Sequence, residues 1–374
     1  MNYLIYFVCR ISDRNFTFIL LNNWYLVINV FMEKRILECV PNFSEGRDLN
    51  VIAQITDIIN KVKGVKLLSI EPGRGANRTV VTFAGEPEPV CEAAFQAVKK
   101  ASELIDMSKH SGAHPRMGAT DVLPLVPVSG VTMDEAVKYA RSLARRIGEE
   151  LRIPVYCYEY AAFIEKRRNL AEVRRGEYEG LRNKLADPEW KPDFGPAVFN
   201  EKSGAIAVGA REFLVAFNVN LNTTSKHIAD AIAAAVREKG SIRNENGKKI
   251  NVTGKLKGVK AIGWYIEEYG KAQVSMNVTR LSVTPVHLAF EEVCRKAEEM
   301  GVKVTGSELI GLIPLKAMLD AGKYFLRKYK RTEEAGEEEL IRIAVESMGM
   351  SEIHEFRPEE KILEYLIESK GETI

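Results

Sequence analysis

Residues 36–63 read ILECVPNFSEGRDLNVIAQITDIINKVK, and this stretch decides the fold that we expect. The apolar run Ile36–Val40 predicts a buried strand, and Pro41–Gly46 is polar and rich in turn-forming residues. Between Asn50 and Lys63, isoleucine and valine recur at helical spacing, which predicts an amphipathic helix. The stretch is therefore a strand, a turn and a helix in direct succession, as expected at the start of an α/β layer structure.

A similar unit opens the second half of the chain. Phe213–Asn218 predicts a strand, the polar turn Asn220–Ser225 could cap the next helix, and Ile228–Glu238 predicts that helix. This resemblance indicates a weak internal duplication. Around both units, predicted strands alternate with helices of ten or more residues. We therefore expect an α/β fold, α+β-like in detail, with two similar subdomains, each a mixed β-sheet with helices on its outer face.

Between the two units, one stretch differs in composition. Ala161–Asp193 is basic and lacks long apolar runs, and we expect a solvated helical arm there. The following segment, 195–204, is a loop by composition.

Length and charge limit the possible classes of protein. A chain of 374 residues exceeds the size of most single cores, so we divide it into an extension (1–31) and two subdomains (32–212 and 213–374). The net charge of +2 predicts no nucleic-acid partner and no anionic membrane surface. The 5 cysteines are scattered singly, as is typical of reduced thiols in the cytoplasm.

Residues 1–31 are more apolar and aromatic than the rest. Their apolar runs are interrupted by Arg10, Asp13 and Arg14, so none reaches the ~20 residues of a membrane span. The order of segments typical of a signal peptide is absent. We expect Met32 to begin the functional protein, with the extension a start-site artefact or a poorly packed tail.

Two of the 5 histidines, His110 and His114, lie four residues apart in one glycine-containing loop. A metal site could use both with Asp121 as a third ligand, but Gly112 and Pro115 disfavour the helix that this pairing needs. Ordinary loop histidines are a second interpretation. The third is acid–base chemistry at His114, whose imidazole has an ordinary pKa of ~6.5. The residues alone leave these interpretations open.

Ten segments in order along the chain resemble the formiminotransferase family. They extend from about Ile36 to Pro314, which leaves mainly residues 1–31 without a counterpart. No phosphate-loop or dinucleotide-binding glycine pattern accompanies them. The segments are Glu38–Gly46, Asn77–Val80, Ile105–Ser108, His110–Pro127, Gly176–Glu179, Trp190–Pro196, Gly209–Leu214, Ala216–Asn218, Gly263–Tyr265 and Gly306–Pro314.

The resemblance implies an activity. Enzymes of this family move a formimidoyl group between N-formimidoyl-L-glutamate and tetrahydrofolate, the co-substrate, at the end of histidine degradation. It further implies that His114 is the catalytic general acid/base and that a homodimer holds substrates in a tunnel between the subdomains. We expect no metal, because Gly112 and Pro115 weaken the metal interpretation, and we expect a cytoplasmic protein. A folate-bordering loop is implied at Gly195, Pro196, Ala197, Val198, Phe199, Asn200, Glu201, Lys202, Ser203 and Gly204.

Six further residues complete the expected site. We place Asn42, Glu71 and Asn77 around the reacting centre as hydrogen-bonding groups, and Arg78 and Arg116 near substrate carboxylates or the folate tail. Alternative roles are a helix cap for Asn42 and a strand-surface charge for Arg78. Asp121 is expected to orient a substrate or to fix the imidazole tautomer of the catalytic histidine.

Two other functions remain open at this point. One is a glutamate formyltransferase that uses 5-formyltetrahydrofolate, and the other is a folate-binding protein without catalysis. In vertebrate members of the family a cyclodeaminase domain follows the transferase. Because the sequence ends at Ile374, we expect no cyclodeaminase activity.

Overall fold

The computed structural model describes the backbone of residues 6–11, 14–21, 24–28, 34–112, 114–245, 248–330 and 335–368. Side chains are described from residue 34 onward, except at positions 243, 245 and 248. Within residues 1–31, β1 (Tyr6–Ile11), β2 (Arg14–Leu21) and β3 (Trp24–Ile28) pair as an antiparallel sheet. The prediction of a poorly packed tail concerns side chains outside the described residues.

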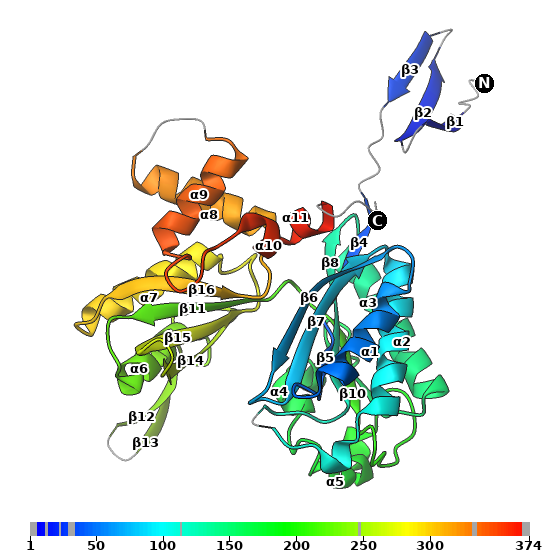
Figure 1. Cartoon of the computed structure of the whole chain (residues 1–374), viewed down its shortest axis with the longest axis horizontal. Coiled ribbons are helices and arrows are strands. Elements are labelled where there is room, and N and C mark those ends of the chain that lie inside the picture. The colour runs from blue at the N-terminus through cyan, green and yellow to red at the C-terminus, as the bar shows by residue number, and fades with distance from the viewer. Residues whose placement is uncertain are drawn as a thin grey trace.

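The first subdomain is built on a mixed sheet (Figure 1). Its strand order is β6-β7-β4/β5-β8-β10-β9, in which β4 and β5 are one strand broken at Val40-Pro41. The first four positions are antiparallel, whereas β8, β10 and β9 run parallel. The strands are β4 (Ile36–Cys39), β5 (Asn42–Phe43), β6 (Val65–Gly73), β7 (Arg78–Gly85), β8 (Thr120–Ser129), β9 (Val155–Glu159) and β10 (Ile206–Ala210).

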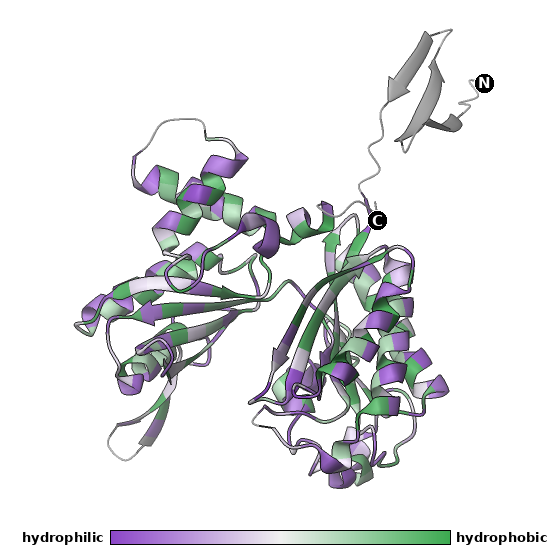
Figure 2. Ribbon diagram, viewed as in Figure 1, coloured by the Kyte–Doolittle hydropathy of each residue, from purple (hydrophilic) through white to green (hydrophobic). Residues whose placement is uncertain are grey.

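Helices α1 (Leu49–Asn60), α2 (Pro87–Leu104) and α3 (Met133–Glu150) cover one face of this sheet (Figure 1). Asp48 caps α1 by accepting from two backbone N–H groups, and a capping box of Thr132 and Glu135 begins α3. The apolar faces of the helices and the mainly apolar strands enclose the first core (Figure 2). The predicted strand–turn–helix unit at 36–63 is thus confirmed.

The basic segment between β9 and β10 packs on the opposite face of the sheet. It contains only short helices, so the prediction of a solvated helical arm is wrong. Gly176 has a positive φ of 88° and interrupts the segment, while Leu181 and Trp190 help to form a small buried core against the strands. Its elements are η2 (Glu165–Arg167), α4 (Leu170–Val173), α5 (Leu181–Ala186) and η3 (Pro188–Trp190).

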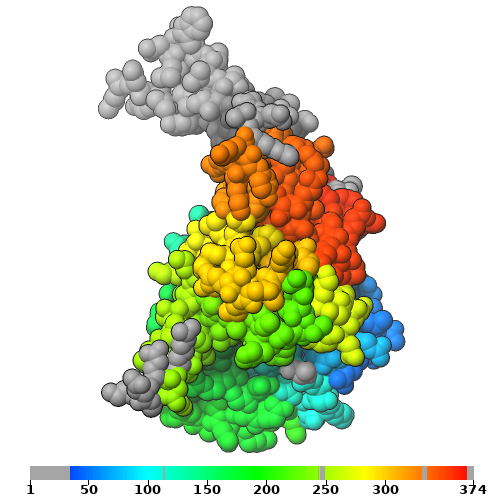
Figure 3. Space-filling view, turned by 90° about the vertical axis from the view of Figure 1, so that its left-hand side faces the viewer, coloured from blue at the N-terminus to red at the C-terminus, as the bar shows by residue number. Residues whose placement is uncertain are grey.

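The second subdomain has a four-stranded sheet in the order β14-β15-β11-β16, with helices α6 and α7 against one face. Figure 3 faces the second subdomain, and in this view α7 and the C-terminal helices form much of the outer surface. The elements are β11 (Val215–Leu221), α6 (Lys226–Val236), β12 (Ser241–Glu245), β13 (Lys248–Val252), β14 (Val259–Ile266), β15 (Lys271–Val278), α7 (Val286–Glu299), β16 (Val304–Ile310), α8 (Leu315–Lys328), α9 (Glu337–Met348), α10 (Pro358–Lys361) and α11 (Leu363–Glu368).

The two subdomains share one topology. In each, a central strand leads to a helix, a strand pair, a second helix and a strand that returns beside the first, a split β-α-β-β-α-β unit. The predicted duplication is therefore confirmed at the level of topology. The prediction of a mixed sheet in both is wrong for the second, whose described pairings are all antiparallel. Parallel pairing needs β9 and β10, which are additions to the first unit.

The C-terminal segment joins the subdomains. Helix α11 returns to the first sheet beside β6 (Figure 1), where Leu363 and Ile367 form a shared apolar cluster with Ile36 and Ala84. Lys66 donates to the backbone oxygen of Ile367 at 2.9 Å. The main cores lie on either side, within 37–210 and 215–362. This partition supports the proposed division at 212/213.

Candidate functional site

A β-bulge places Asp121 at the centre of the site. Asn42 pairs with Val122 on β8, but the next residue, Phe43, pairs with Thr120. Asp121 is therefore an extra residue in the ladder, and a bulge of this kind redirects its side chain. The Asp121 carboxylate is fully buried and accepts from the backbone N–H of Met117 at 3.0 Å.

Two arginines share the buried Asp121 carboxylate. Arg78 bonds to Oδ2 from the start of β7, and Arg174, which follows α4, donates to Oδ1 at 3.3 Å and to Oδ2. Burial alone would raise the pKa of Asp121, but the two guanidinium groups outweigh it and hold this pKa below its ordinary value. Two cations therefore face one anion, and the cluster carries one excess positive charge.

Asn42 completes the cluster from the central strand. Its side-chain oxygen accepts from Arg78 at 2.7 and 3.1 Å, and its amide nitrogen donates to the Val40 oxygen at 2.8 Å. This second bond spans the break between β4 and β5. Asn42 therefore aims the Arg78 guanidinium at Asp121, and the helix-capping role falls to Asp48 instead.

His114 is half-buried beside this cluster. Its Nδ1 lies 2.7 Å from the Pro115 carbonyl oxygen, so Nδ1 carries the proton and donates it. This bond leaves the lone pair on Nε2, for which no hydrogen-bond partner occurs among the described residues. Burial lowers the pKa of His114, and the positive charges of Arg78 and Arg174 lower it further. The imidazole is therefore a neutral proton acceptor at neutral pH.

Asn77 and Arg116 lie beside the histidine loop, but their polar atoms serve the protein itself. Asn77 accepts from the Gly46 N–H at 3.0 Å and donates to the Ser111 oxygen at 2.9 Å. Arg116 is buried and pairs with Glu179 at 2.6 Å. Contact of either side chain with a substrate stays a prediction.

Glu71 faces the second subdomain. It pairs with Val80 on β7, which in turn pairs with Asn42, so the three side chains lie on one face of the sheet. Ser69 donates to the Glu71 carboxylate at 3.1 Å. A Cβ atom built on Gly311, which follows β16, would lie 3.6 Å from Glu71 Oε1. This carboxylate is therefore positioned where the two subdomains meet.

The loop 195–204 ends beside Gly118 and Ala119, the two residues that precede β8. Ala119 donates to the Ser203 oxygen at 2.9 Å, and Gly118 bridges to Gly204. A side chain at Gly118 would clash with the Ala205 oxygen, so this close approach requires glycine. Within the loop, Val198 is 67% exposed. The geometry brings the C-terminal end of the predicted folate loop next to the predicted catalytic segment.

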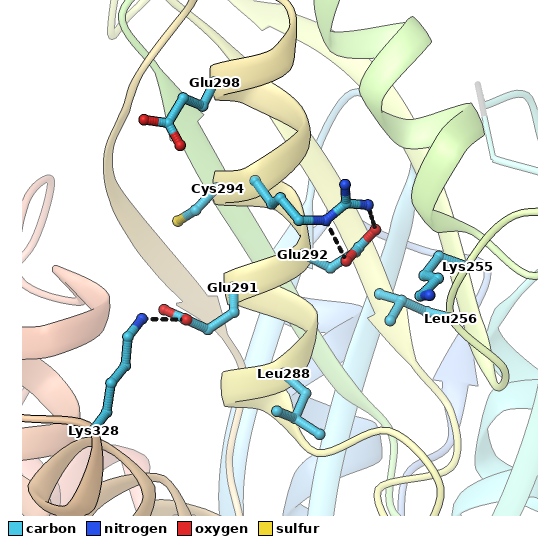
Figure 4. A pocket seen from close by; sticks show the side chains of 9 residues that line it. Lys255, Leu256, Leu288, Glu291, Glu292, Cys294, Glu298 and Lys328 are labelled. Atoms are coloured by element: carbon cyan, nitrogen blue, oxygen red, sulfur yellow. Dashed lines mark hydrogen bonds and ion pairs between the residues drawn. The ribbon is translucent and has the colours of Figure 1, made fainter.

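A surface pocket of about 480 Å³ adjoins the histidine loop and is lined by His110, Ser111, Gly112, Arg116, Gly176, Glu177 and Glu179. Another pocket, of about 510 Å³, lies by the outer side of α7, where Glu291 pairs with Lys328 and Glu292 with Arg295 (Figure 4). Four of the charged side chains of this second pocket are thus paired, and the pocket lies on the helical side of the second sheet.

The candidate metal ligands His110 and Asp121 are bonded to other groups of the protein. His110 Nε2 lies 2.9 Å from the Asn77 oxygen, and His110 Nδ1 accepts from Arg116 at 3.2 Å. Asp121 is held by two arginines. The described residues contain no group of three or more His, Cys, Asp or Glu side chains suited to a metal ion. They also contain no helix long and apolar enough to cross a membrane.

Sequence reasoning missed Arg174 and the link between Arg116 and Glu179. Arg174 belongs to a run of basic residues that composition alone describes as a solvated surface. Only the tertiary fold brings it to Asp121, 53 positions away. A buried Asp with two arginine partners leaves no local pattern in a single sequence.

The candidate site therefore combines a half-buried histidine with two arginines that share one buried carboxylate, on a duplicated α/β fold. Residues 36–211 match the formiminotransferase domain, N-terminal subdomain, and residues 216–368 match the formiminotransferase domain. The chain belongs to the formiminotransferase family.

Curated relatives extend this result. The chain is 42% identical over 78% of its length to the glutamate formimidoyltransferase of Thermoplasma acidophilum, covering 92% of that protein. It is 44% identical over 78% to the Streptococcus pyogenes serotype M1 protein of the same name, covering 94%. The formimidoyltransferase-cyclodeaminase of Sus scrofa is 46% identical over 90% of this chain. The chain spans 61% of that longer relative's length.

Proposed function

We propose that this chain transfers the formimidoyl group between N-formimidoyl-L-glutamate and tetrahydrofolate in histidine degradation. The observation that carries the proposal is the state of His114, whose Nδ1 is bonded to the Pro115 oxygen while Nε2 keeps a free lone pair. The family membership and the names of the Thermoplasma acidophilum and Streptococcus pyogenes relatives support the choice of reaction.

The reaction needs one proton to move between two nitrogens. In the direction that forms glutamate, N5 of tetrahydrofolate attacks the formimidoyl carbon, so the N5–C bond forms and the bond from that carbon to the glutamate nitrogen breaks. Nε2 of His114 accepts the proton from N5 and then donates it to the departing nitrogen. Both transfers use the same lone pair, so one neutral imidazole is sufficient and no other reactant is consumed.

The excess positive charge suits the anionic substrates. We assign a substrate carboxylate to the Arg78–Arg174 pair, since one Asp121 carboxylate does not neutralise both guanidinium groups. Folate is assigned to the loop 195–204, with the two substrates meeting in a tunnel between the subdomains. Holding two reactants in register would supply much of the rate acceleration. A cytoplasmic homodimer that works without a metal completes the proposal.

Replacement of the histidine tests this mechanism. His114→Ala should lower kcat by about 100- to 10,000-fold, the usual contribution of one positioned acid–base group, with folate affinity changed less than about threefold. Steady-state transfer assays and fluorescence titration with tetrahydrofolate measure the two quantities. The matched control is His227→Ala, an exposed histidine on α6, which should behave as the parent. A His114→Ala protein with parental kcat would remove His114 from the mechanism.

The pH profile gives the same test a sign. Catalysis needs neutral His114, and its pKa is lowered, so kcat of the parent should fall only below about pH 6.5. Parallel assays with 5-formyltetrahydrofolate and glutamate separate formimidoyl from formyl transfer. Folate binding without turnover of either donor would identify a binding protein instead.

A further inference from the structure

We propose that Arg116 is a positioning residue that closes the loop carrying His114 and holds this loop against Arg78. It acts with Asn77, His110 and Glu179, and it contacts no substrate carboxylate. The inference rests on the proposed function and deepens it, because it assigns Arg78 and Arg116 different tasks.

The Arg116 guanidinium has no donor left for a substrate. Its five N–H groups match five hydrogen bonds: Nε to His110 Nδ1, one nitrogen to Glu177 and Glu179, and the other to the His110 oxygen and Glu179. The side chain is 8% exposed, whereas those of the two carboxylates are 42% and 65% exposed. Arg116 thus lies beneath its partners and is saturated by them.

Arg116 joins the two ends of the loop that runs from His110 to Arg116 and carries His114. Its side chain reaches back to the backbone oxygen of His110 at 3.3 Å, and its own backbone oxygen accepts from Tyr178 at 2.9 Å. His114 lies inside the segment closed in this way. Loss of the guanidinium would release one end of the loop from the other, while Asp121 would keep its ion pairs with Arg78 and Arg174.

Asn77 fixes the closed loop to the strand that bears Arg78. The side-chain amide of Asn77 donates to the Ser111 oxygen, and the Asn77 backbone oxygen accepts from His110 Nε2, both at 2.9 Å. A side chain at Gly112 would clash with the Ala76 oxygen, so the two turns are in direct contact. Because Arg78 follows Asn77 directly, these bonds set the position of His114 relative to Arg78.

His110 is a connector in this arrangement and does not serve as a second acid–base group. Its Nε2–H donates to a carbonyl and its Nδ1 accepts from a guanidinium, which specifies the neutral tautomer. A proton on Nδ1 would face the Nε–H of Arg116. Burial also lowers the pKa of His110. Acid–base chemistry is thereby left to His114, four residues further along.

Conservative substitution separates positioning from substrate binding. Arg116→Lys cannot make the forked contacts, so kcat should fall about 10- to 100-fold while KM for N-formimidoyl-L-glutamate changes less than threefold. The acid limb of the pH profile should keep its midpoint, since His114 remains the titrating group. His110→Gln should retain more kcat than His110→Ala, because glutamine can still donate to the Asn77 oxygen. The control is Arg175→Lys, an exposed arginine paired with Glu172, which should match the parent.

A second measurement does not depend on the reaction. Hydrogen exchange of backbone amides in residues 108–119 should accelerate at least tenfold in Arg116→Lys, with exchange in α1–α3 unchanged. A large rise in KM with unaltered kcat and unaltered exchange would overturn the proposal in favour of substrate binding. If the parent protein transfers no formimidoyl group, the proposed function fails, yet faster loop exchange would still support the positioning role.

Discussion

The two subdomains share a strand order but differ in the chemistry of the sheet face opposite α1–α3 in the first and opposite α6 and α7 in the second. In the first, this face carries two arginines and an aspartate around Asn42. In the second, a ladder of neutral groups crosses the equivalent strands: Trp264 donates to Gln273 at 2.9 Å, and Gln273 donates to Asn220 at 2.7 Å. The duplicated fold is therefore compatible with either arrangement.

The difference lies in how completely each set of polar groups is satisfied. The second ladder ends where Asn220 donates to Glu352 at 2.6 Å and Lys271 neutralises that carboxylate. Its charges balance. The first cluster keeps an excess positive charge and a histidine with a free lone pair. An excess charge in a buried site lowers the stability of the fold. We propose that this charge is retained because the site binds an anion.

The largest effect should come from removing the carboxylate that holds the first cluster together. Asp121→Ala leaves Arg78 and Arg174 buried without an anion, so the free energy of unfolding should fall by about 3–5 kcal/mol and transfer should be lost. Denaturant unfolding and transfer assays measure both. Asp121→Asn keeps the shape but not the charge and should lie between. Parental stability in Asp121→Ala would mean that the two arginines do not need this anion.

The contrast between the subdomains also shows what the sequence could predict. The strands and α1–α3 follow from apolar periodicity, which survives in both copies because each buries one face of a sheet. The helix predicted over Asn50–Lys63 is observed at Leu49–Asn60. The loop histidines could be found, but the choice of His114 needed family resemblance. From the residues alone, three interpretations of the loop that holds His110 and His114 remained open.

Other features depend on contacts between distant residues. The bulge at Asp121 arises from a mismatch between β5 and β8, and Arg174 arrives from a segment that composition describes as solvated. The five bonds of Arg116 likewise depend on Glu177 and Glu179 of the same segment. Local patterns in one sequence do not contain such pairings. The bonds of Arg174 and Arg116 distinguish the first subdomain from its copy, whereas a similar register shift also occurs between β11 and β16, at Asn220/Leu221.

A smaller effect, with a defined pH dependence, should come from the other end of the first central strand. Glu38 on β4 is 2% exposed, and its Oε2 has no hydrogen-bond partner among the described residues. Burial raises the pKa of Glu38 to about 7, with Arg211 opposing and Glu364 reinforcing the shift. In the second subdomain, Ala216 occupies the position four residues before Asn220, as Glu38 does before Asn42.

The sign of the Glu38 effect follows from linkage. Native Glu38 keeps its proton up to about pH 7, whereas the unfolded chain releases it near pH 4.5. The native state therefore binds more protons in this interval, and stability is lost as pH rises from about 4.5 to 7. The loss amounts to roughly 3 kcal/mol. Glu38→Gln should abolish this slope, as measured by denaturant unfolding across the pH range. If the free energy of unfolding changed with pH in the same way in parent and variant, Glu38 would be ionised in the native state and the prediction would be wrong.

The smallest functional effect is expected in the second subdomain, at the ladder itself. Asn220→Ala leaves the Gln273 amide and the Glu352 carboxylate each without one partner, so the free energy of unfolding should fall by about 1–3 kcal/mol. Because this ladder is satisfied within the protein, kcat should stay within about threefold of the parent. Unfolding curves and transfer assays on one preparation measure both. If kcat fell as far as in Asp121→Ala while stability was retained, both copies of the duplicated face would take part in catalysis, and the division between an active and a structural face would be wrong.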